Sequence, residues 1–274
     1  MALKGNLLYN GDFERGTTEG WVTGPFGLQF EYDFSVSAEA KYRGNYGGLL
    51  YAPNDFVDGY LAYNKTCSIE EYEAYLGIMY VKIVSGVFVF GQLYGLDDKG
   101  NLIDKLIIGY NGEEGVWRKY QAILRGFGDM THFQIGLYTW CFNAGDKIYI
   151  DEAKLIPLES IKGHVLAETV KFNNLTTDKQ YYLTLACIGR CKIESIVKVY
   201  NVSGTDPTLK PYVYTALFPD GSTSLTIEHT TFTTEGRERK SFELPEISFI
   251  KLYYDVGGDN PSFDVEHYIR IYPQ

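Results

Sequence analysis

Two segments of the sequence alternate large aromatic and amide side chains with aliphatic ones. In an extended strand Gln134, Tyr138 and Trp140 share one side, and Ile135 and Leu137 share the other. Aromatic rings stack on the apolar face of a sugar ring, and amides form hydrogen bonds with its hydroxyl groups. The polar side of this segment therefore has the chemistry of a carbohydrate site, while its aliphatic side is expected to face the core.

The segment 87–94 divides in the same way, with Gln92 and Tyr94 on its polar side. If the two strands are neighbours, Tyr80 and Lys82 extend the same surface. The alternative is that this aromatic face packs against a loop, the second half of the chain or another subunit, because exposed aromatic patches are also typical of protein interfaces. The predicted carbohydrate-binding face consists of Tyr80, Gln92, Tyr94, Gln134, Tyr138 and Trp140.

Motifs of catalysis are missing from the sequence. It has no G-x-S-x-G, no H-E-x-x-H and no glycine-rich phosphate loop, and no spacing identifies the facing carboxylate pair of a glycosidase. The histidines His132, His164, His229 and His267 are scattered singly, which favours positions at the surface or the core edge. We therefore expect a protein that is not an enzyme.

The cysteines are too sparse for a disulfide framework. Cys187 and Cys191 have a spacing that matches no zinc knuckle and have no companion Cys/His pair, so a buried thiol or a local bridge is expected there rather than a metal. Disulfide states are left open for all four, Cys67, Cys141, Cys187 and Cys191.

The charge of the chain argues against nucleic acid as a partner. A formal net charge of −10 repels a phosphate backbone, and no basic run offsets it locally. Residues 1–6 lack the pattern of a signal peptide, and no apolar run is long enough for membrane insertion. We expect an extracellular, cell-surface or virion location, reached through a removed leader or within a larger particle.

Strand signals dominate the whole chain. Short runs rich in Val, Ile, Tyr, Phe and Thr recur between Gly, Asn, Asp and Pro clusters, with almost no helical periodicity. The 24 Tyr and 16 Phe fit such strands and also fit binding faces. The predicted fold class is all-β, with two tandem antiparallel β-sandwiches. The expected strands are 7–13, 28–36, 48–51, 75–84, 86–94, 102–109, 117–124, 133–142 and 147–157, then 181–188, 193–201, 212–218, 224–233, 240–244, 247–256 and 262–272.

A short linker at 157–163 separates the expected domains, residues 1–158 and 164–274. The segment beginning at Glu114 parallels the one beginning at Glu235, and each is followed by a similar strand. This predicts that the second sandwich is a diverged repeat of the first. The segment 255–261 contains two Gly and predicts a turn between the last two strands, with a calcium loop as an alternative.

Four pieces of the first half follow one another over about residues 6–157: Asn10-Gly11-Asp12-Phe13-Glu14 leading to Trp21; Ala38–Gly48; Tyr75–Lys82 with the following strand to Tyr94; and Trp117 followed by Ile148–Glu152. In this order they resemble the jelly-roll carbohydrate-binding modules grouped as families four and nine. The resemblance implies a jelly roll whose first strand contains the Asn-Gly-Asp-Phe-Glu run. Core packing is the expected role of Phe13, Trp21 and Trp117.

The same resemblance implies a structural calcium ion near the edge of the sandwich. By position its ligands would be Asp12 or Glu14 together with Asp151, and a backbone carbonyl within 41–44. The alternative is that Asp12 caps a turn and Glu14 pairs with Arg15 or Arg43.

Two classes of function follow. The resemblance favours a non-catalytic surface protein that binds polysaccharide or glycoconjugate. The alternative is a structural subunit of an extracellular assembly, such as a virion capsid, decoration or tail protein or a surface appendage, built from copies of itself or other particle proteins. Self-assembly is favoured by the abundance of aromatic residues in both halves and by the lack of an attached catalytic domain that a binding module would target.

Overall fold

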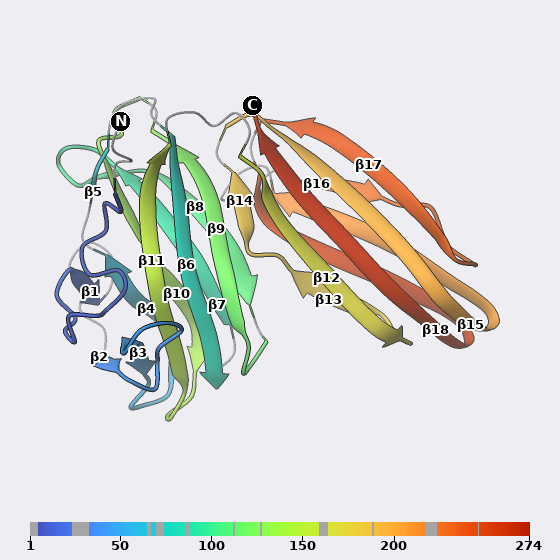
Figure 1. Ribbon diagram of the computed structural model, residues 1–274, viewed down its shortest axis with the longest axis horizontal. Coiled ribbons are helices and arrows are strands. Elements are labelled where there is room, and N and C mark those ends of the chain that lie inside the picture. The colour runs from blue at the N-terminus through green and yellow to red at the C-terminus, as the bar shows by residue number, and fades with distance from the viewer. Residues whose placement is uncertain are drawn as a thin grey trace. The chain divides into compact units, whose positions relative to one another are not determined.

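The computed structural model describes residues 5–23, 33–64, 67–69, 74–85, 88–111, 113–126, 128–158, 164–187, 189–216, 224–245 and 247–274. These residues form β-strands joined by turns, with no helix among them, which confirms the all-β prediction (Figure 1). In this described part, no helix is available to cross a membrane. The chain divides into two compact units, residues 1–160 and 161–274, and the division falls inside the segment expected to be a linker.

The strands of the first unit form two antiparallel sheets. Sheet A has the order β1 (Trp21–Thr23), β4 (Phe56–Asn64), β10 (His132–Phe142), β7 (Phe88–Leu96) and β8 (Leu102–Asn111), with β5 (Cys67–Ser68) also beside β10. Sheet B has, within this unit, the order β9 (Trp117–Arg125), β6 (Ala74–Ser85), β11 (Lys147–Leu158), β3 (Gly47–Tyr51) and β2 (Asp33–Ser37). Along the chain the strands cross repeatedly from one sheet to the other, as in a jelly roll.

The core of the first unit lies between sheets A and B. Ile135 and Leu137 of β10 are buried there, as their alternation predicts. The ring of Phe133, on the same side of β10, meets the ring of Tyr75 from β6 edge-on at a centroid distance of 5.6 Å. Because side chains alternate along a strand, the residues between these core positions point to the outer face of sheet A.

The opening stretch of the chain differs from the prediction. Residues 7–13 form turns instead of a first strand, because Asn10 and Phe13 adopt φ angles of 53° and 56°, outside the β region. Phe13 and Trp21 nevertheless lie in the core, as predicted, with ring centroids 5.0 Å apart. The indole N–H of Trp21 donates to the carbonyl of Asn10 at 3.0 Å, so the turns are held against the start of β1.

The second unit is built on two strands of 26 residues, β15 (Cys191–Ala216) and β18 (Ser248–Pro273). They pair with each other antiparallel from end to end and form sheet C with four flanking strands. β12 (Leu166–Leu175) and β13 (Lys179–Tyr182) lie beside β18, whereas β16 (Ser224–Glu228) and β17 (Gly236–Leu244) lie beside β15. A single bridge between Cys187 and Ile247 joins the short β14 (Leu185–Cys187) to this unit.

Both long strands bend at their middles, where the sequence predicts that separate strands end. The pairing of β15 with β18 continues through this point with register shifts between Tyr200 and Thr208. Gly204 has a φ of +114° and Gly258 a φ of +103°, and the two glycines lie on the two strands at this bend. The turn predicted at 255–261 is therefore a bend within β18, and the turn residues of the two strands face each other.

The bend doubles sheet C over into a second sandwich. β12 and β17 flank one half of the long strands, and β13 and β16 flank the other half. The two layers meet in the core, where the ring of Phe172 from β12 contacts the ring of Tyr254 from the other half at 5.2 Å. This confirms the prediction of two tandem sandwiches. The diverged repeat stays a prediction, because the first unit uses two separate sheets and the second uses one doubled sheet.

A chain of five hydrogen-bonded polar side chains crosses the core of the second unit. Tyr254 Oη lies 2.9 Å from Nδ1 of His267, whose Nε2 lies 2.7 Å from Ser195 Oγ. Ser195 Oγ is 2.8 Å from Nε2 of His229, whose Nδ1 is 2.9 Å from Glu238 Oε2. One assignment of protons satisfies all four bonds with neutral imidazoles and an ionised Glu238, each group donating toward the carboxylate.

This chain corrects the expectation that the histidines stand singly, since the rings of His229 and His267 are 5.6 Å apart. Ser195, His229 and Glu238 have the bonding order of a nucleophile, a base and an acid. Ser195 is 0% exposed and is also bonded to a second imidazole, so a substrate has no access to its hydroxyl. The arrangement is a satisfied buried network and offers no support for catalysis.

The described cysteine side chains are free thiols. Cys187 and Cys191 are buried, which agrees with the buried-thiol alternative. Burial raises the pKa of the Cys67 thiol to about 11, so this half-buried residue is unreactive at neutral pH. The side chain of Cys141 lies outside the described residues.

The two buried histidines predict a pH dependence of stability. Burial holds the pKa of His267 well below its usual value, and burial also lowers the pKa of His229. Below the unfolded-state pKa of about 6.5, the unfolded chain therefore binds protons that the folded chain does not bind, and stability falls as the pH is lowered. We expect His267→Gln to cost about 1–3 kcal/mol at pH 7 and to flatten the pH dependence between 7 and 5 in urea titrations. The exposed His164→Gln is the control and should reproduce the wild-type slope.

The bend in sheet C predicts that Gly204 cannot be replaced cheaply. A Cβ atom at Gly204 would lie 2.7 Å from the carbonyl oxygen of Asn260 on the partner strand. Gly189 is a matched control, because its φ is also positive, at +91°, but a Cβ there would meet nothing within 4 Å. We expect Gly204→Ala to destabilise the protein by more than Gly189→Ala, by at least about 1 kcal/mol. Equal losses in a chemical denaturation experiment would contradict this account of the bend.

Candidate functional site

The strands predicted to form a binding face are neighbours in sheet A. In the register of β7 and β10, Gln134 lies opposite Tyr94, Gly136 lies opposite Gln92, and Tyr138 lies opposite Phe90. Opposite residues share a face, so the structure brings Gln92, Tyr94, Gln134 and Tyr138 together on the outer face of sheet A. Gly136 has no side chain, which leaves the space over the middle of this group to its neighbours.

Much of this outer face is covered. Gln92, Tyr94 and Gln134 are 1%, 3% and 5% exposed, although they point away from the core between the sheets. Part of the cover comes from β1, because Val22 packs against Tyr94 and its neighbour Leu96. Tyr138 is half-buried. The face is therefore an enclosed polar and aromatic surface rather than an open sheet.

Two amides meet this surface with different hydrogen bonding. The hydroxyl of Tyr94 donates to Oε1 of Gln92 at 2.6 Å, which fixes the orientation of that amide. Gln134 Oε1 is buried and finds no hydrogen-bond partner within the described part of the chain. Leaving a buried amide oxygen without a donor costs about 1–3 kcal/mol. This atom is the feature of the surface that folding alone does not account for.

The two remaining residues of the predicted face are Trp140 and Tyr80. Trp140 lies on β10 opposite Phe88, in line with Tyr138, and only its backbone is among the described atoms. Tyr80 is a correction: it belongs to β6 in sheet B, where it lies opposite Lys119 and Asp151. β6 pairs with β9 and β11 and not with β7, so neither Tyr80 nor the suggested Lys82 can extend the face of sheet A.

Trp117 is a second correction. It was expected to pack in the core, but it is half-buried on the outer face of sheet B, opposite Lys82. The next residue, Arg118, takes the inward position and is 8% exposed. A Trp that begins a strand is usually expected to pack in the core. Here the alternation of side chains along β9 places Arg118 on the inner face and the indole of Trp117 on the outer face.

Two carboxylates hold the loop that follows Ala40. Asp151 accepts hydrogen bonds from the backbone N–H groups of Tyr42 at 2.8 Å and Arg43 at 3.0 Å, and from its own neighbour Glu152 at 2.7 Å. Burial raises the pKa of Asp151 to about 6, although these N–H groups act in the opposite direction. These hydrogen bonds fix the loop to β11, although the two segments are more than 100 positions apart in the sequence.

Glu14 holds the next part of the same loop. It accepts the backbone N–H of Asn45 at 2.7 Å and of Tyr46 at 3.0 Å, and the side-chain amide of Asn45 at 2.9 Å. The Tyr46 N–H and the two Asn45 donors hold the pKa of Glu14 below its usual value. Neither predicted arginine is its partner. Asp12 accepts the N–H of Glu14 at 3.4 Å within an exposed turn, in line with the capping alternative.

These donors bear on the predicted calcium site of Asp12, Glu14 and Asp151. Calcium needs six to eight oxygen ligands, whereas Glu14 and Asp151 present their oxygens to N–H groups. In the described ranges, no three or more His, Cys, Asp or Glu side chains gather where a metal ion could be held. The arrangement therefore does not fit the predicted ligand set, and the calcium ion stays a prediction to be tested.

Comparison with known proteins gives matches at the level of structure. No protein-family model matches the chain, and no curated protein matches it by sequence. The N-terminal tandem of two CBM22 domains from Paenibacillus barcinonensis Xyn10C is similar over 100% of this chain and 99% of its own, with 14% identity and a TM-score of 0.42. The CBM22-1 xylan-binding domain of the same protein covers 58% of this chain and 99% of its own, with 19% identity and a TM-score of 0.40.

A third similar structure is the enzymatically active domain of tailspike protein 4 from bacteriophage CBA120, which covers 56% of this chain and 21% of its own, with 18% identity and a TM-score of 0.43. At these TM-scores the likenesses are too loose to carry a ligand, an activity or a site residue from those proteins to this chain. The candidate site therefore depends on its own geometry.

The Asp151 contacts predict how the loop after Ala40 is stabilised. Asp151→Ala leaves two N–H groups of the loop and one of Glu152 without their acceptor, and we expect it to lower the free energy of unfolding by about 1–3 kcal/mol. Asp12→Ala, at an exposed turn, should have little effect. Urea titration with and without a chelator tests the calcium prediction in the same samples. A wild-type midpoint that is unchanged by the chelator removes the ion, whereas a fall to the Asp151→Ala value establishes it.

Proposed function

We propose that this chain is a non-catalytic protein that binds a polysaccharide or glycoconjugate on the outer face of sheet A. The binding residues are Gln92, Tyr94, Gln134 and Tyr138, with Trp140 next in line on β10. Tyr80 is not included, because it lies in the other sheet.

The observation that carries the proposal is the buried oxygen of Gln134. It lies on the outer face, beside the Tyr94–Gln92 pair, and lacks a donor among the described residues. A sugar hydroxyl is a donor of the right kind. The half-buried ring of Tyr138 lies four residues further along β10, on the same face, where it can stack against a pyranose ring. An amide with a free oxygen beside an aromatic ring is a combination that selects hydroxylated rings over purely apolar ligands.

The Tyr94–Gln92 hydrogen bond supplies the second element of recognition. Its length of 2.6 Å and its burial keep the Gln92 amide in one orientation before any ligand arrives. Preorganised polar groups lose less side-chain entropy on binding than groups that must be ordered at that moment. We infer that a ligand first meets the half-buried Tyr138, that the buried Tyr94–Gln92 pair holds the surface behind it in shape, and that Gln134 supplies an acceptor when the ligand displaces what covers it.

Membership of the family four or nine type of module and an extracellular, cell-surface or virion location are consistent with a polysaccharide ligand. The alternative is a structural subunit of an extracellular assembly. Light scattering of the purified protein tests it directly, because filaments or shells would favour that class and a monodisperse monomer would oppose it.

Replacement of Gln134 separates binding from stability. Gln134→Leu removes the orphaned oxygen and keeps a similar volume, so we expect unchanged or higher stability in urea titrations. The same variant should lose about tenfold or more in affinity for neutral polysaccharides such as xylan or galactan in affinity electrophoresis, because it cannot accept the sugar hydroxyl. Tyr138→Ala should weaken binding similarly through loss of stacking.

The matched control is Tyr212→Ala, which removes a half-buried tyrosine from the second unit. It should leave retention by the polysaccharide unchanged. Equal retention of wild type, Gln134→Leu and Tyr138→Ala would refute the proposed site, and no retention of the wild type by any neutral polysaccharide would refute the proposed function.

A further inference from the structure

Sheet B carries a row of aromatic and cationic side chains on its outer face. Lys82 of β6 lies opposite Trp117 of β9 on one side and opposite Tyr149 of β11 on the other. The two rings are 6.4 Å apart between centroids and inclined at 41°. Trp117 and Lys82 are half-buried and reachable from solvent, whereas Tyr149 is buried. The core lies on the other side of this sheet, and packing there does not require these residues.

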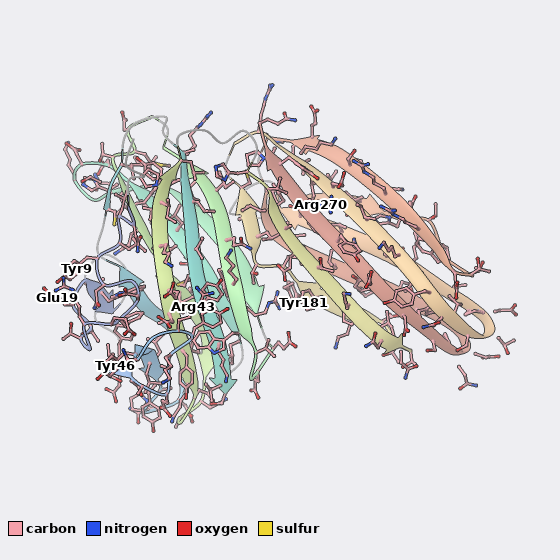
Figure 2. All side chains as sticks on the ribbon, viewed as in Figure 1. Tyr9, Glu19, Arg43, Tyr46, Tyr181 and Arg270 are labelled. Carbon is pink, nitrogen blue, oxygen red and sulfur yellow. The ribbon has the colours of Figure 1, made fainter. Side chains whose placement is uncertain are left out.

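The loop after Ala40 adds a wall to this row. Tyr42 stacks on Tyr80 with centroids 4.0 Å apart and approaches the ring of Trp117 at 5.3 Å. The guanidinium of Arg43 lies over the ring of Tyr42 at 5.5 Å. Figure 2 shows Arg43 in front of the strands of sheet B, on the outer face. Because Asp151 holds the N–H groups of this loop, the wall is fixed in place before a ligand binds.

The cations around this row differ in their partners, in a protein that carries a formal net charge of −10. Lys147 is paired with Glu39 at 3.6 Å, and Lys154 is paired with Glu152. Within the described part of the chain, no carboxylate forms an ion pair with Lys82 or Arg43. Glu14 and the buried Asp151 bind the backbone of the loop, so Lys82 and Arg43 are the cations of this row that a ligand can use.

We propose that this row is a second binding site, which takes an acidic polysaccharide that bears uronate groups. The ring of a uronic acid packs against Trp117, and its carboxylate pairs with Lys82, which lies opposite Trp117 on β6, or with Arg43, whose guanidinium lies over the neighbouring ring of Tyr42. A neutral glycan would satisfy the rings and leave both cations unused, whereas a small anion would leave the rings unused. Charge complementarity together with aromatic faces therefore selects a charged sugar chain. This site is separate from the one on sheet A and does not depend on it.

The test uses the full chain and polygalacturonate as the probe in affinity electrophoresis. We expect the wild type to be retarded, Lys82→Glu to lose at least about tenfold in affinity, and Trp117→Ala to lose a similar amount. Retardation should also weaken as salt is raised from about 0.05 to 0.5 M, because ion pairs with an exposed cation are screened. Lys82→Met, which keeps the length of the side chain without its charge, covers the case in which Lys82→Glu folds poorly.

Two controls separate this site from that on sheet A. Lys99→Glu makes the same charge change at an exposed turn and should retain binding to polygalacturonate. Gln134→Leu should retain it as well, whereas Lys82→Glu should leave retention by neutral polysaccharides unchanged. The proposal is overturned if polygalacturonate fails to retard the wild type, or if Lys82→Glu, Lys82→Met and Trp117→Ala bind it as the wild type does.

Discussion

The alternation of side chains along a strand is the constraint on which this protein depends. Each strand of the first unit gives one face to the core between sheets A and B, and whatever chemistry it carries must occupy the other face. On β10 the aliphatic Ile135 and Leu137 are committed to the core, which places Gln134 and Tyr138 on the outside. On β9 the same rule turns Trp117 outward. Both proposed sites are thus consequences of one packing requirement, applied once to each sheet.

Carboxylate groups solve a second problem, which is how to fix irregular loops to regular sheets. The backbone N–H groups of a loop find no carbonyl acceptor on a neighbouring strand. One buried or half-buried carboxylate can accept hydrogen bonds from several of them. Asp151 and Glu14 do this for the loop after Ala40, although Glu14 lies near the start of the first unit's sequence and Asp151 near its end. In the second unit Glu238 plays a similar part, accepting the N–H of Thr230 at 2.8 Å as well as the bond from His229. Acidity of this chain therefore serves its architecture as well as its surface.

The sequence predicted class, strand positions and the pairing of aromatic faces better than it predicted where chains bend. Periodicity of two placed Gln92, Tyr94, Gln134 and Tyr138 on one side of their strands, and the register of β7 and β10 brings them together. It could not assign Tyr80 to a sheet, because alternation identifies a face of a strand but not the strands beside it.

Gly and Asn near 201–207 and 257–261 signal a change of direction, and a turn and a bend within a strand use the same residues. The turns at 7–13 were missed although Asn10-Gly11-Asp12 is a turn sequence, because the family resemblance assigned this run to a first strand. The buried pairing of His229 with His267 joins residues 38 positions apart and leaves no local signal.

The doubled sheet of the second unit also orders events during synthesis. β18 lies between β15 and the pair β12 and β13, so it is a central strand, and it follows all of these strands along the chain. The strands that pair with β18, namely β12, β13 and β15, are synthesised first. Their edges stay unpaired until residues 248–273 have been made. Leu166 of β12 pairs with Ile271 of β18 across 105 positions, so the closing contacts are among the most distant that this unit possesses. The interval before β18 appears is when β15 is most exposed to pairing with another chain.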